Sequence, residues 1–429
     1  MATILDTKVT LENSNGDKEN EFAKNLLKMM EESMAAPPMI DHTWKSEKLP
    51  RLMLCSGNTS CEIENIFDDL SKNDAKVTSH AIAPYRGFIV LQDDSSAQIQ
   101  AISHVSNKNT RSIWFIYSGI RSYWPGMGQQ LLRIPAFKNS FDECAKAVET
   151  FGVDLYDLIY HPKPDEEMDI VDKMVIVTAM HIVMTELLKK MNIHPDGFIG
   201  FSLSEICCGY ADDGLTKEQT MKLAYYRGYT MKKNSEKIKG GSAMVFTSWE
   251  KIKERCLPGV HLCIHGGTDC TGIAGDLENI KKMVEQFQKE NIIARVVDTD
   301  RAPHSPQMHA IYDELLAYNK TVITEPKQRS TKWATSVDST DSKCSPEFFT
   351  DSACNPVYFY EALRKIPENS LVIEVGPWAQ MESMLLPELP KNCDYVGLVK
   401  RRKPEILAFL EAIGKLYTHG YNVKSEILQ

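Results

Sequence analysis

The stretch Asp196–Tyr210 places one serine at the centre of a strand, turn and helix pattern. It reads Asp-Gly-Phe-Ile-Gly-Phe-Ser-Leu-Ser-Glu-Ile-Cys-Cys-Gly-Tyr. The apolar residues before Gly200 predict a short strand, the glycine permits a sharp turn, and the residues after Ser202 favour a helix. Such a turn exposes the Ser202 hydroxyl and directs N–H groups of the helix N-terminus toward an oxyanion formed there. The pattern is that of a nucleophile elbow, with Ser204 in place of the usual last glycine, although such a short string also arises by chance.

Composition limits the class of protein that carries this pattern. The 429 residues, 43% of them hydrophobic, can bury a large core and predict two or three domains. No apolar run approaches the roughly 20 residues of a membrane span, and the N-terminus lacks a signal peptide's apolar core, so we expect a cytoplasmic protein with no membrane partner. A net charge of -9 disfavours a nucleic-acid partner. The 11 cysteines include no Cys-x-x-Cys and indicate reduced thiols rather than a disulfide framework or metal site.

The run Lys400-Arg401-Arg402-Lys403 is the local exception to the acidic balance. We interpret it as a solvated loop before a helix in preference to a docking patch for an acidic partner.

The N-terminal part of the chain divides into two segments. Residues 1–47 are polar and predict a flexible segment, with a possible helix over Glu21–Met34. Residues 48–111 predict a small α/β linker domain. Its expected parts are a strand Arg51–Cys55, a helix Ser60–Leu70, a strand Tyr85–Leu91 and a polar loop 92–111.

Residues 112–243 predict the first part of the domain that carries Ser202. Val175, Ala179 and Leu187 place apolar side chains along a helix expected over Asp172–Met191, and a second helix, Lys217–Lys232, carries Arg227. An isolated arginine on a helix is usually a surface charge. The pair Gly126 and Gly128 lacks the third glycine of a dinucleotide fingerprint, so we reject nucleotide binding there.

Residues 244–303 alternate as βαββαβ, the order of a ferredoxin-like unit. The expected elements are strands Met244–Phe246, His261–Ile264, Thr271–Ala274 and Ile292–Val297, and helices Ser248–Arg255 and Asp276–Lys289. Residues 304–429 predict the second part of the core and a C-terminal linker helix. Their expected elements are helices Met308–Tyr318, Val357–Leu363 and Glu405–Leu416, and a strand Leu371–Val375.

A serine nucleophile needs a base, and His304 is the preferred candidate among the 11 histidines. It lies in a loop directly after the inserted unit, between Pro303 and Ser305-Pro306, and loops at domain junctions often carry catalytic groups. A surface histidine is the equal alternative on spacing alone. His261 and His265 lack a third ligand, and we expect them to be packing residues rather than metal ligands.

Several collinear blocks run through the chain from Leu49 onward. They are Leu49-Pro-Arg-Leu, Ser56-Gly57, Pro84-Tyr-Arg-Gly-Phe, Trp114-Phe-Ile-Tyr-Ser-Gly, Trp124, Gly126-Met-Gly128, Cys208-Gly-Tyr-Ala-Asp212, Tyr226-Arg-Gly228 and His304-Ser305. In these blocks the chain resembles the linker and malonyl/acetyl acyltransferase region of an animal-type fatty acid synthase. The implied fold is an α/β-hydrolase-like acyltransferase core with an inserted ferredoxin-like subdomain, preceded by a small α/β linker domain.

The resemblance implies a role for six positions. It places Ser202 on the nucleophile, His304 on the general base and Arg227 on the arginine that pairs with a malonyl carboxylate. It also implies backbone oxyanion donors at Leu203 and Tyr123 and a backbone carbonyl at Ser352 that orients the histidine. No cofactor or metal is implied: coenzyme A thioester is the substrate, and the phosphopantetheine thiol of an acyl carrier protein is the acceptor. A monomer is compatible with this reading.

Several positions depart from the family pattern. They are Phe201, Ser204, Tyr123, His181, Ser352, Trp378 and Pro303. Losing one supporting donor costs about 100-fold in rate. The alternative is therefore a catalytically impaired member that serves as a binding or scaffold module, and a serine esterase is a third reading that leaves Arg227 without a purpose.

Overall fold

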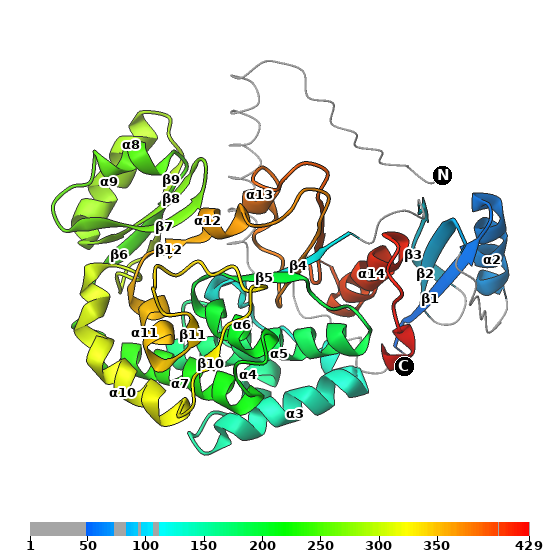
Figure 1. Cartoon of the computed structure of the whole chain (residues 1–429), viewed down its shortest axis with the longest axis horizontal. Helices are drawn as coiled ribbons and strands as arrows, with labels where there is room; N and C mark the ends of the chain where they lie inside the picture. The colour runs from blue at the N-terminus through cyan, green and yellow to red at the C-terminus, as the bar shows by residue number, and fades with distance from the viewer. Residues whose placement is uncertain (1–48, 73–82, 93–95, 106–110, 402, 429) are drawn as a thin grey trace. The chain divides into compact units, whose positions relative to one another are not determined.

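The computed structural model describes residues 49–72, 83–92, 96–105, 111–401 and 403–428 (Figure 1). The expected flexible segment 1–47 and the helix Glu21–Met34 lie outside these residues. Within them, no helix is long and apolar enough to cross a bilayer. All eleven cysteines lie inside the described ranges, and each is free.

A parallel sheet of four strands carries the elbow. Its order is β14-β13-β4-β5, with β4 (Ile113–Tyr117), β5 (Gly197–Gly200), β13 (Leu371–Val375) and β14 (Asp394–Gly397). Every residue of β4, β5 and β13 is buried. Uninterrupted apolar strands of this kind are typical of parallel sheets covered on both faces. The carboxyl end of β5 is Gly200, so Ser202 lies at the carboxyl edge of the sheet, where α/β proteins place their ligands.

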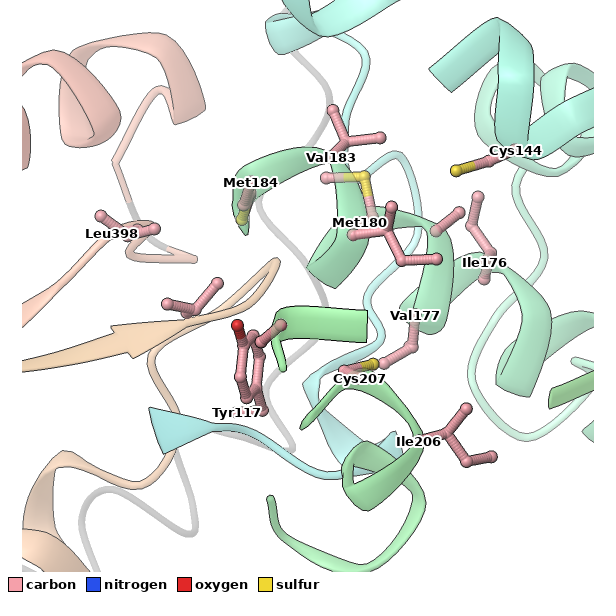
Figure 2. Close-up of a cluster of buried hydrophobic side chains, with 14 of the residues drawn as sticks. Tyr117, Cys144, Ile176, Val177, Met180, Val183, Met184, Ile206, Cys207 and Leu398 are labelled. Carbon is pink, nitrogen blue, oxygen red and sulfur yellow. The ribbon is translucent and has the colours of Figure 1, made fainter. Parts of the chain in front are cut away.

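The long helix α5 (Ile170–Lys190) forms the centre of the core. It is apolar on nearly all sides, and Asp169 caps its first turn by accepting from the Val171 N–H. Figure 2 shows Met180 and Val183 of α5 in the same cluster as Cys207, which follows the elbow, and Tyr117 at the end of β4. The predicted helix Asp172–Met191 is confirmed to within two residues.

The remaining helices and short strands of the core surround this centre. They are α3 (Pro135–Glu149), α4 (Leu155–Tyr160), α6 (Glu205–Ala211), α7 (Lys217–Lys233), α10 (Tyr312–Val322), α11 (Pro346–Cys354), α12 (Phe359–Leu363), α13 (Glu382–Leu385), α14 (Glu405–Thr418), β10 (Lys327–Gln328), β11 (Lys343–Cys344) and the short 3-10 helices η2 (Ile120–Ser122), η3 (Leu131–Arg133), η4 (Ser202–Ser204), η5 (Pro306–Ile311) and η6 (Ser425–Leu428).

The inserted sheet confirms the predicted ferredoxin-like order. Its strands are β6 (Gly241–Val245), β7 (Val260–Gly267), β8 (Cys270–Gly275) and β9 (Ala294–Asp298), and its helices are α8 (Trp249–Lys253) and α9 (Leu277–Lys289). These four strands are antiparallel in the order β7-β8-β6-β9. Figure 1 shows α8 and α9 on the same side of this sheet.

A fifth strand joins the inserted sheet from the core. β12 (Val357–Tyr358) pairs in parallel with β7 and gives the order β12-β7-β8-β6-β9. The predicted helix Val357–Leu363 is therefore wrong in its first two residues, because a local pattern cannot reveal a partner strand 93 residues away in sequence. Only Phe359–Leu363 is helical.

The linker domain contains one strand more than predicted. β1 (Arg51–Gly57), β2 (Tyr85–Gln92) and β3 (Ser96–His104) form an antiparallel sheet in the order β1-β2-β3, with α2 (Ser60–Lys72) packed against it. The polar loop expected over 92–111 is wrong for β3. Its sequence, SAQIQAISH, alternates polar and apolar residues from Ser96 to Ala101, a strand pattern that the prediction of a loop overlooked. Pairing with β2 satisfies its backbone groups.

Strand β2 joins the linker domain to the C-terminal helix. Ile89 belongs to the cluster under α2, whereas Phe88 belongs to the main core on the other face, as strand alternation requires. Gly414 of α14 lies directly over the Phe88 ring, because a Cβ added there would meet Phe88 Cγ at 2.3 Å. This close approach fixes α14 against the linker sheet.

We expect Gly414→Ala to destabilise the protein. In an open helix the change would stabilise by about 1 kcal/mol, but here the new methyl group overlaps the fully buried Phe88 ring. Overpacking of this kind costs about 1–3 kcal/mol. Urea unfolding measures the loss, and the same substitution in a Phe88→Leu background should cost less. An equal loss in both backgrounds would show that the ring is not the cause.

Candidate active site

The backbone around Ser202 has the strained geometry of a nucleophile elbow. Ser202 has a φ of 58°, in the left-handed region, and begins the single turn η4. A Cβ at Gly200 would lie 2.5 Å from the Glu205 N atom, so only glycine fits between β5 and α6. Ser204 donates its hydroxyl to the Ser118 carbonyl at 2.6 Å. This bond gives the residue that replaces the usual glycine a structural purpose.

His304 lies within hydrogen-bond distance of the serine. Its Nε2 is 2.6 Å from Ser202 Oγ, and its Nδ1 is 2.9 Å from the Asn355 carbonyl oxygen. A carbonyl only accepts, so Nδ1 carries the proton and Nε2 is free to accept from the serine. The two residues that the sequence singled out as nucleophile and base therefore lie side by side.

The surroundings of His304 keep its ring uncharged. Burial and, to a smaller extent, the positive charge of Arg227 lower the pKa of His304 from 6.5 to about 3, although the bond to the Asn355 carbonyl opposes both. The imidazole is 3% exposed. At neutral pH it is therefore a neutral proton acceptor.

The carbonyl that orients His304 is that of Asn355, not that of Ser352, so the expectation for Ser352 is wrong. Ser352 lies inside α11, and its hydroxyl donates to the Phe349 carbonyl at 2.8 Å. Asn355 follows the last residue of α11, where backbone carbonyls have no partner within the helix. The helix end therefore supplies the free acceptor, three residues later than predicted.

Of the two expected oxyanion donors, one is already occupied. The Tyr123 N–H donates to the Ile120 carbonyl at 3.3 Å, and its hydroxyl donates to the Lys163 carbonyl at 2.8 Å. Because an amide has one hydrogen to donate, the expectation for Tyr123 is corrected. Leu203 lies in η4 directly after Ser202, and η2 packs against this turn.

Arg227 points inward from the middle of α7 and ends at the serine. Its Nη2 is 3.3 Å from Ser202 Oγ, and the side chain is 5% exposed. Its Nε and Nη1 have no hydrogen-bond partner in the described part of the chain. Burial lowers the pKa of Arg227 to about 10, so the guanidinium is still charged at neutral pH. A buried cation with two unused donors provides a site for an anion.

Glu205 supports the elbow, and the sequence analysis missed it. It is fully buried and accepts from Trp333 Nε1 at 2.7 Å, from the Ser336 N–H at 2.6 Å and from the Ser336 hydroxyl at 2.7 Å. The sequence did contain a signal for this role. A carboxylate at the start of an otherwise apolar helix is expected to be buried and therefore to need hydrogen-bond partners.

The sequence profile of the acyl transferase domain matches residues 114–423, which include all these residues. The chain belongs to the acyl transferase domain family. Its expected fold, an acyltransferase core with a ferredoxin-like subdomain, is also that of solved acyl transferase domains. The domain from module 8 of the salinomycin polyketide synthase superimposes with a TM-score of 0.74 at 19% identity, covering 88% of this chain and 98% of that one. The domain of ZmaA gives 0.74 at 17% identity, covering 89% and 97%.

Curated relatives of this acyl transferase domain are large synthases. The reducing polyketide synthase FUB1 of Gibberella moniliformis (strain M3125 / FGSC 7600) is 26% identical over 88% of this chain and 18% of its own length. The highly reducing polyketide synthase sphB of Aspergillus fumigatus (strain CBS 144.89 / FGSC A1163 / CEA10) is 23% identical over 90% and 16%. The chain thus spans less than a fifth of these relatives. The acyltransferase part of the predicted resemblance is confirmed, and these relatives are polyketide synthases rather than animal fatty acid synthases.

Phe201 and His181, two residues that depart from the family pattern, make apolar contacts near the elbow. The Phe201 ring packs edge to face on Phe359 with centroids 5.0 Å apart. His181 of α5 is fully buried, and neither ring nitrogen has a partner among the described residues. Burial lowers the pKa of His181 to about 3, so it packs as a neutral ring against Tyr117.

Proposed function

We propose that this domain transfers a carboxylated acyl group, malonyl or a close analogue, from coenzyme A to the phosphopantetheine thiol of an acyl carrier protein. The contact of Ser202 Oγ with His304 Nε2 at 2.6 Å carries the proposal. A serine and a neutral imidazole held at that distance form the pair that nucleophilic acyl transfer requires.

The first half-reaction loads the serine. His304 takes the proton of Ser202 while Oγ attacks the thioester carbonyl, and the Leu203 N–H donates to the oxyanion. The intermediate collapses to the acyl-enzyme, and the thiol of coenzyme A leaves with the proton from His304. In the second half-reaction the carrier thiol attacks the ester, gives its proton to His304 and leaves with the acyl group, while Ser202 recovers its hydrogen.

Arg227 favours a substrate with a free carboxylate. Its Nε and Nη1 donors lack partners among the described residues, and its Nη2 lies beside Ser202 Oγ. A planar guanidinium binds a carboxylate through two parallel hydrogen bonds. An acyl group that ends in a carboxylate uses these donors, whereas acetyl leaves them buried and unpaired.

The synthases that match this chain support a polyketide assembly line as its setting, in preference to fatty acid synthesis. FUB1 and sphB are polyketide synthases, and the chain covers 18% and 16% of their lengths. We therefore propose a carrier protein of that class as the acceptor.

Incubation with malonyl-CoA should add one malonyl group to Ser202. Intact-protein mass spectrometry followed by peptide mapping detects the adduct, and free carrier thiol should remove it. Ser202→Ala should give no adduct. A wild-type protein that binds malonyl-CoA but stays unmodified after long incubation would support the impaired binding module instead.

Arg227→Ala should lower kcat/KM for malonyl-CoA by roughly 10- to 100-fold, because a hydrogen bond to a charged group contributes about 1.5–3 kcal/mol. Acylation by acetyl-CoA, which has no carboxylate, should change much less. Lys222→Ala, at a half-buried lysine of α7 that pairs with Glu218, is the matched control and should leave both substrates unaffected. Equal losses for malonyl-CoA and acetyl-CoA would contradict carboxylate recognition by Arg227.

The pH dependence of the acylation rate should reveal how the charge of Arg227 affects the pKa of His304. The neutral ring is the active form, so its lowered pKa should keep kcat/KM flat as the pH falls through 6.5. A bound malonyl carboxylate offsets the charge of Arg227 and should raise the pKa of His304. The acylation rate at saturating malonyl-CoA should then fall at a higher pH than kcat/KM does. Stopped-flow acylation with circular dichroism at each pH tests this, and coincident profiles would contradict it.

A further inference from the structure

The segment 355–363 contacts both the elbow and the base. It consists of Asn355, Pro356, the strand β12 and the helix α12, and β12 pairs with β7 at the edge of the inserted sheet (Figure 1). The first residue of α12, Phe359, packs on the ring of Phe201, which directly precedes the nucleophile. The carbonyl of Asn355 accepts from His304 Nδ1. A shift of this segment would therefore move the surroundings of the serine and of the histidine together.

His265 of β7 ties the segment 355–363 to the inserted sheet. Its Nδ1 lies 2.7 Å from Glu361 Oε1 on α12. Because an ionised carboxylate only accepts, the imidazole is the donor. In the parallel pairing of β12 with β7, His265 lies opposite Tyr358. The strand β12 and the helix α12 that follows it are therefore both fixed to the same residue of β7, one through the backbone ladder and the other through a side chain.

Two aromatic rings hold the His265 imidazole in this orientation. The ring of Trp249 on α8 and the ring of Tyr360 on α12 have their centroids 5.0 Å and 5.2 Å from that of His265. Trp249 also contacts Tyr358, with centroids 5.9 Å apart. A side chain packed between rings from two helices has little freedom to change rotamer, and such packing is what gives a supporting residue its precision. The bond to Glu361 therefore acts on α12 as a rigid link.

The link from His265 to Glu361 contributes little to the stability of the fold. The side chain of His265 is 17% exposed and that of Glu361 is 51% exposed, and ion pairs at such exposure add little to the free energy of unfolding. The end of β7 is also held independently, because the Thr268 N–H donates to Glu388 Oε1 at 2.6 Å. Catalytic geometry is more sensitive, since a displacement of about 1 Å caused by a distant mutation can cost about 100-fold in rate. Loss of the link should therefore affect the reaction more than the fold.

We propose that His265 and Glu361 are positioning residues that set the distance between Ser202 Oγ and His304 Nε2. This rests on the proposed transfer function. The link fixes α12 against β7, and α12 in turn holds Phe359 on the ring beside the nucleophile. The same link keeps β12 in place, and with it the carbonyl that orients the base.

Single-turnover acylation by malonyl-CoA tests this role. His265→Ala should lower the acylation rate at saturating malonyl-CoA by about tenfold, while the affinity for coenzyme A, measured in the Ser202→Ala background, should change less than twofold. His419→Ala is the matched control. It removes another half-buried histidine, which pairs with Asp394 at the start of β14, the end of the core sheet opposite Ser202. It should leave the rate unchanged. An unchanged rate in His265→Ala, or equal losses in the two variants, would overturn the proposal.

Glu361→Ala tests the partner and guards against a folding defect, because this side chain is half exposed. Circular dichroism checks that each variant is folded. Glu361→Ala should slow acylation about as much as His265→Ala does, and the double variant should be no slower than the slower single variant, since both substitutions remove one bond. His265→Asn, whose amide still offers a donor to Glu361, should be slowed less than His265→Ala. Losses that multiply in the double variant would show that the two residues act separately and would contradict the link.

The Nδ1 proton of His304 provides a readout that does not depend on transfer. In protein with isotope-labelled histidine, its NMR resonance is assigned by its loss in His304→Gln. The resonance should shift in His265→Ala and stay in place in His419→Ala, because only the first substitution releases the segment that carries the Asn355 carbonyl. A protein that shows this shift but never forms an acyl-enzyme would contradict the proposed transfer alone. Acylation at the wild-type rate with an unmoved resonance in His265→Ala would contradict the positioning role alone.

Discussion

The hydrogen bond between Ser202 and His304 depends on the inserted sheet. His304 follows β9, at one edge of the sheet, by a short loop, and Asn355, whose carbonyl holds the other ring nitrogen, immediately precedes Pro356 and β12 at the opposite edge. The segments that fix the imidazole therefore leave the two edges of one five-stranded sheet. Arg121 adds a third connection, because it donates to the Val297 carbonyl at 2.6 Å and to Asp298 at 2.9 Å and so joins the turn η2 to the end of β9. The inserted sheet thus fixes the position of His304 relative to Ser202, which follows a strand of the other sheet.

Burying Arg227 beside His304 makes the empty site electrostatically unfavourable. The guanidinium keeps two donors without partners, and its charge weakens the neighbouring base. A bound carboxylate removes both penalties, since it satisfies the donors and offsets the charge. In the proposed reaction, binding of a carboxylate at the far end of the acyl group would thereby be coupled to the basicity of His304 at the reacting end. Strain of this kind is typical of functional sites, and the large core supplies the stability to hold it.

Much of this arrangement could be predicted from local patterns. The elbow, the apolar helix α5 and the βαββαβ order each reside in a contiguous stretch whose periodicity specifies the element. The resemblance then assigned Ser202, His304 and Arg227, which the fold brings together from three separate segments. What sequence reasoning missed depends on partners far apart in the chain. β12 is a strand only because β7 lies beside it, and Asn355 is an acceptor only because α11 ends there. β3, by contrast, carries a short polar/apolar alternation of its own, and its pairing with β2 completes the strand.

Where this chain departs from the family pattern, buried packing contacts and hydrogen bonds from other residues hold the elbow in place of the family's polar side chains. Phe201 packs on Phe359, the residue that directly follows β12, so the base of the elbow gains an apolar contact with the segment that orients His304. Glu205 holds the other side through Trp333 and Ser336, and fully satisfied buried networks of this kind rigidify the backbone they join. One unfavourable feature remains at His181: its two buried ring nitrogens have no hydrogen-bond partner in the described structure. That ring packs edge to face on Tyr117, so we expect the loss to fall on stability, while the 2.6 Å contact between Ser202 and His304 is retained.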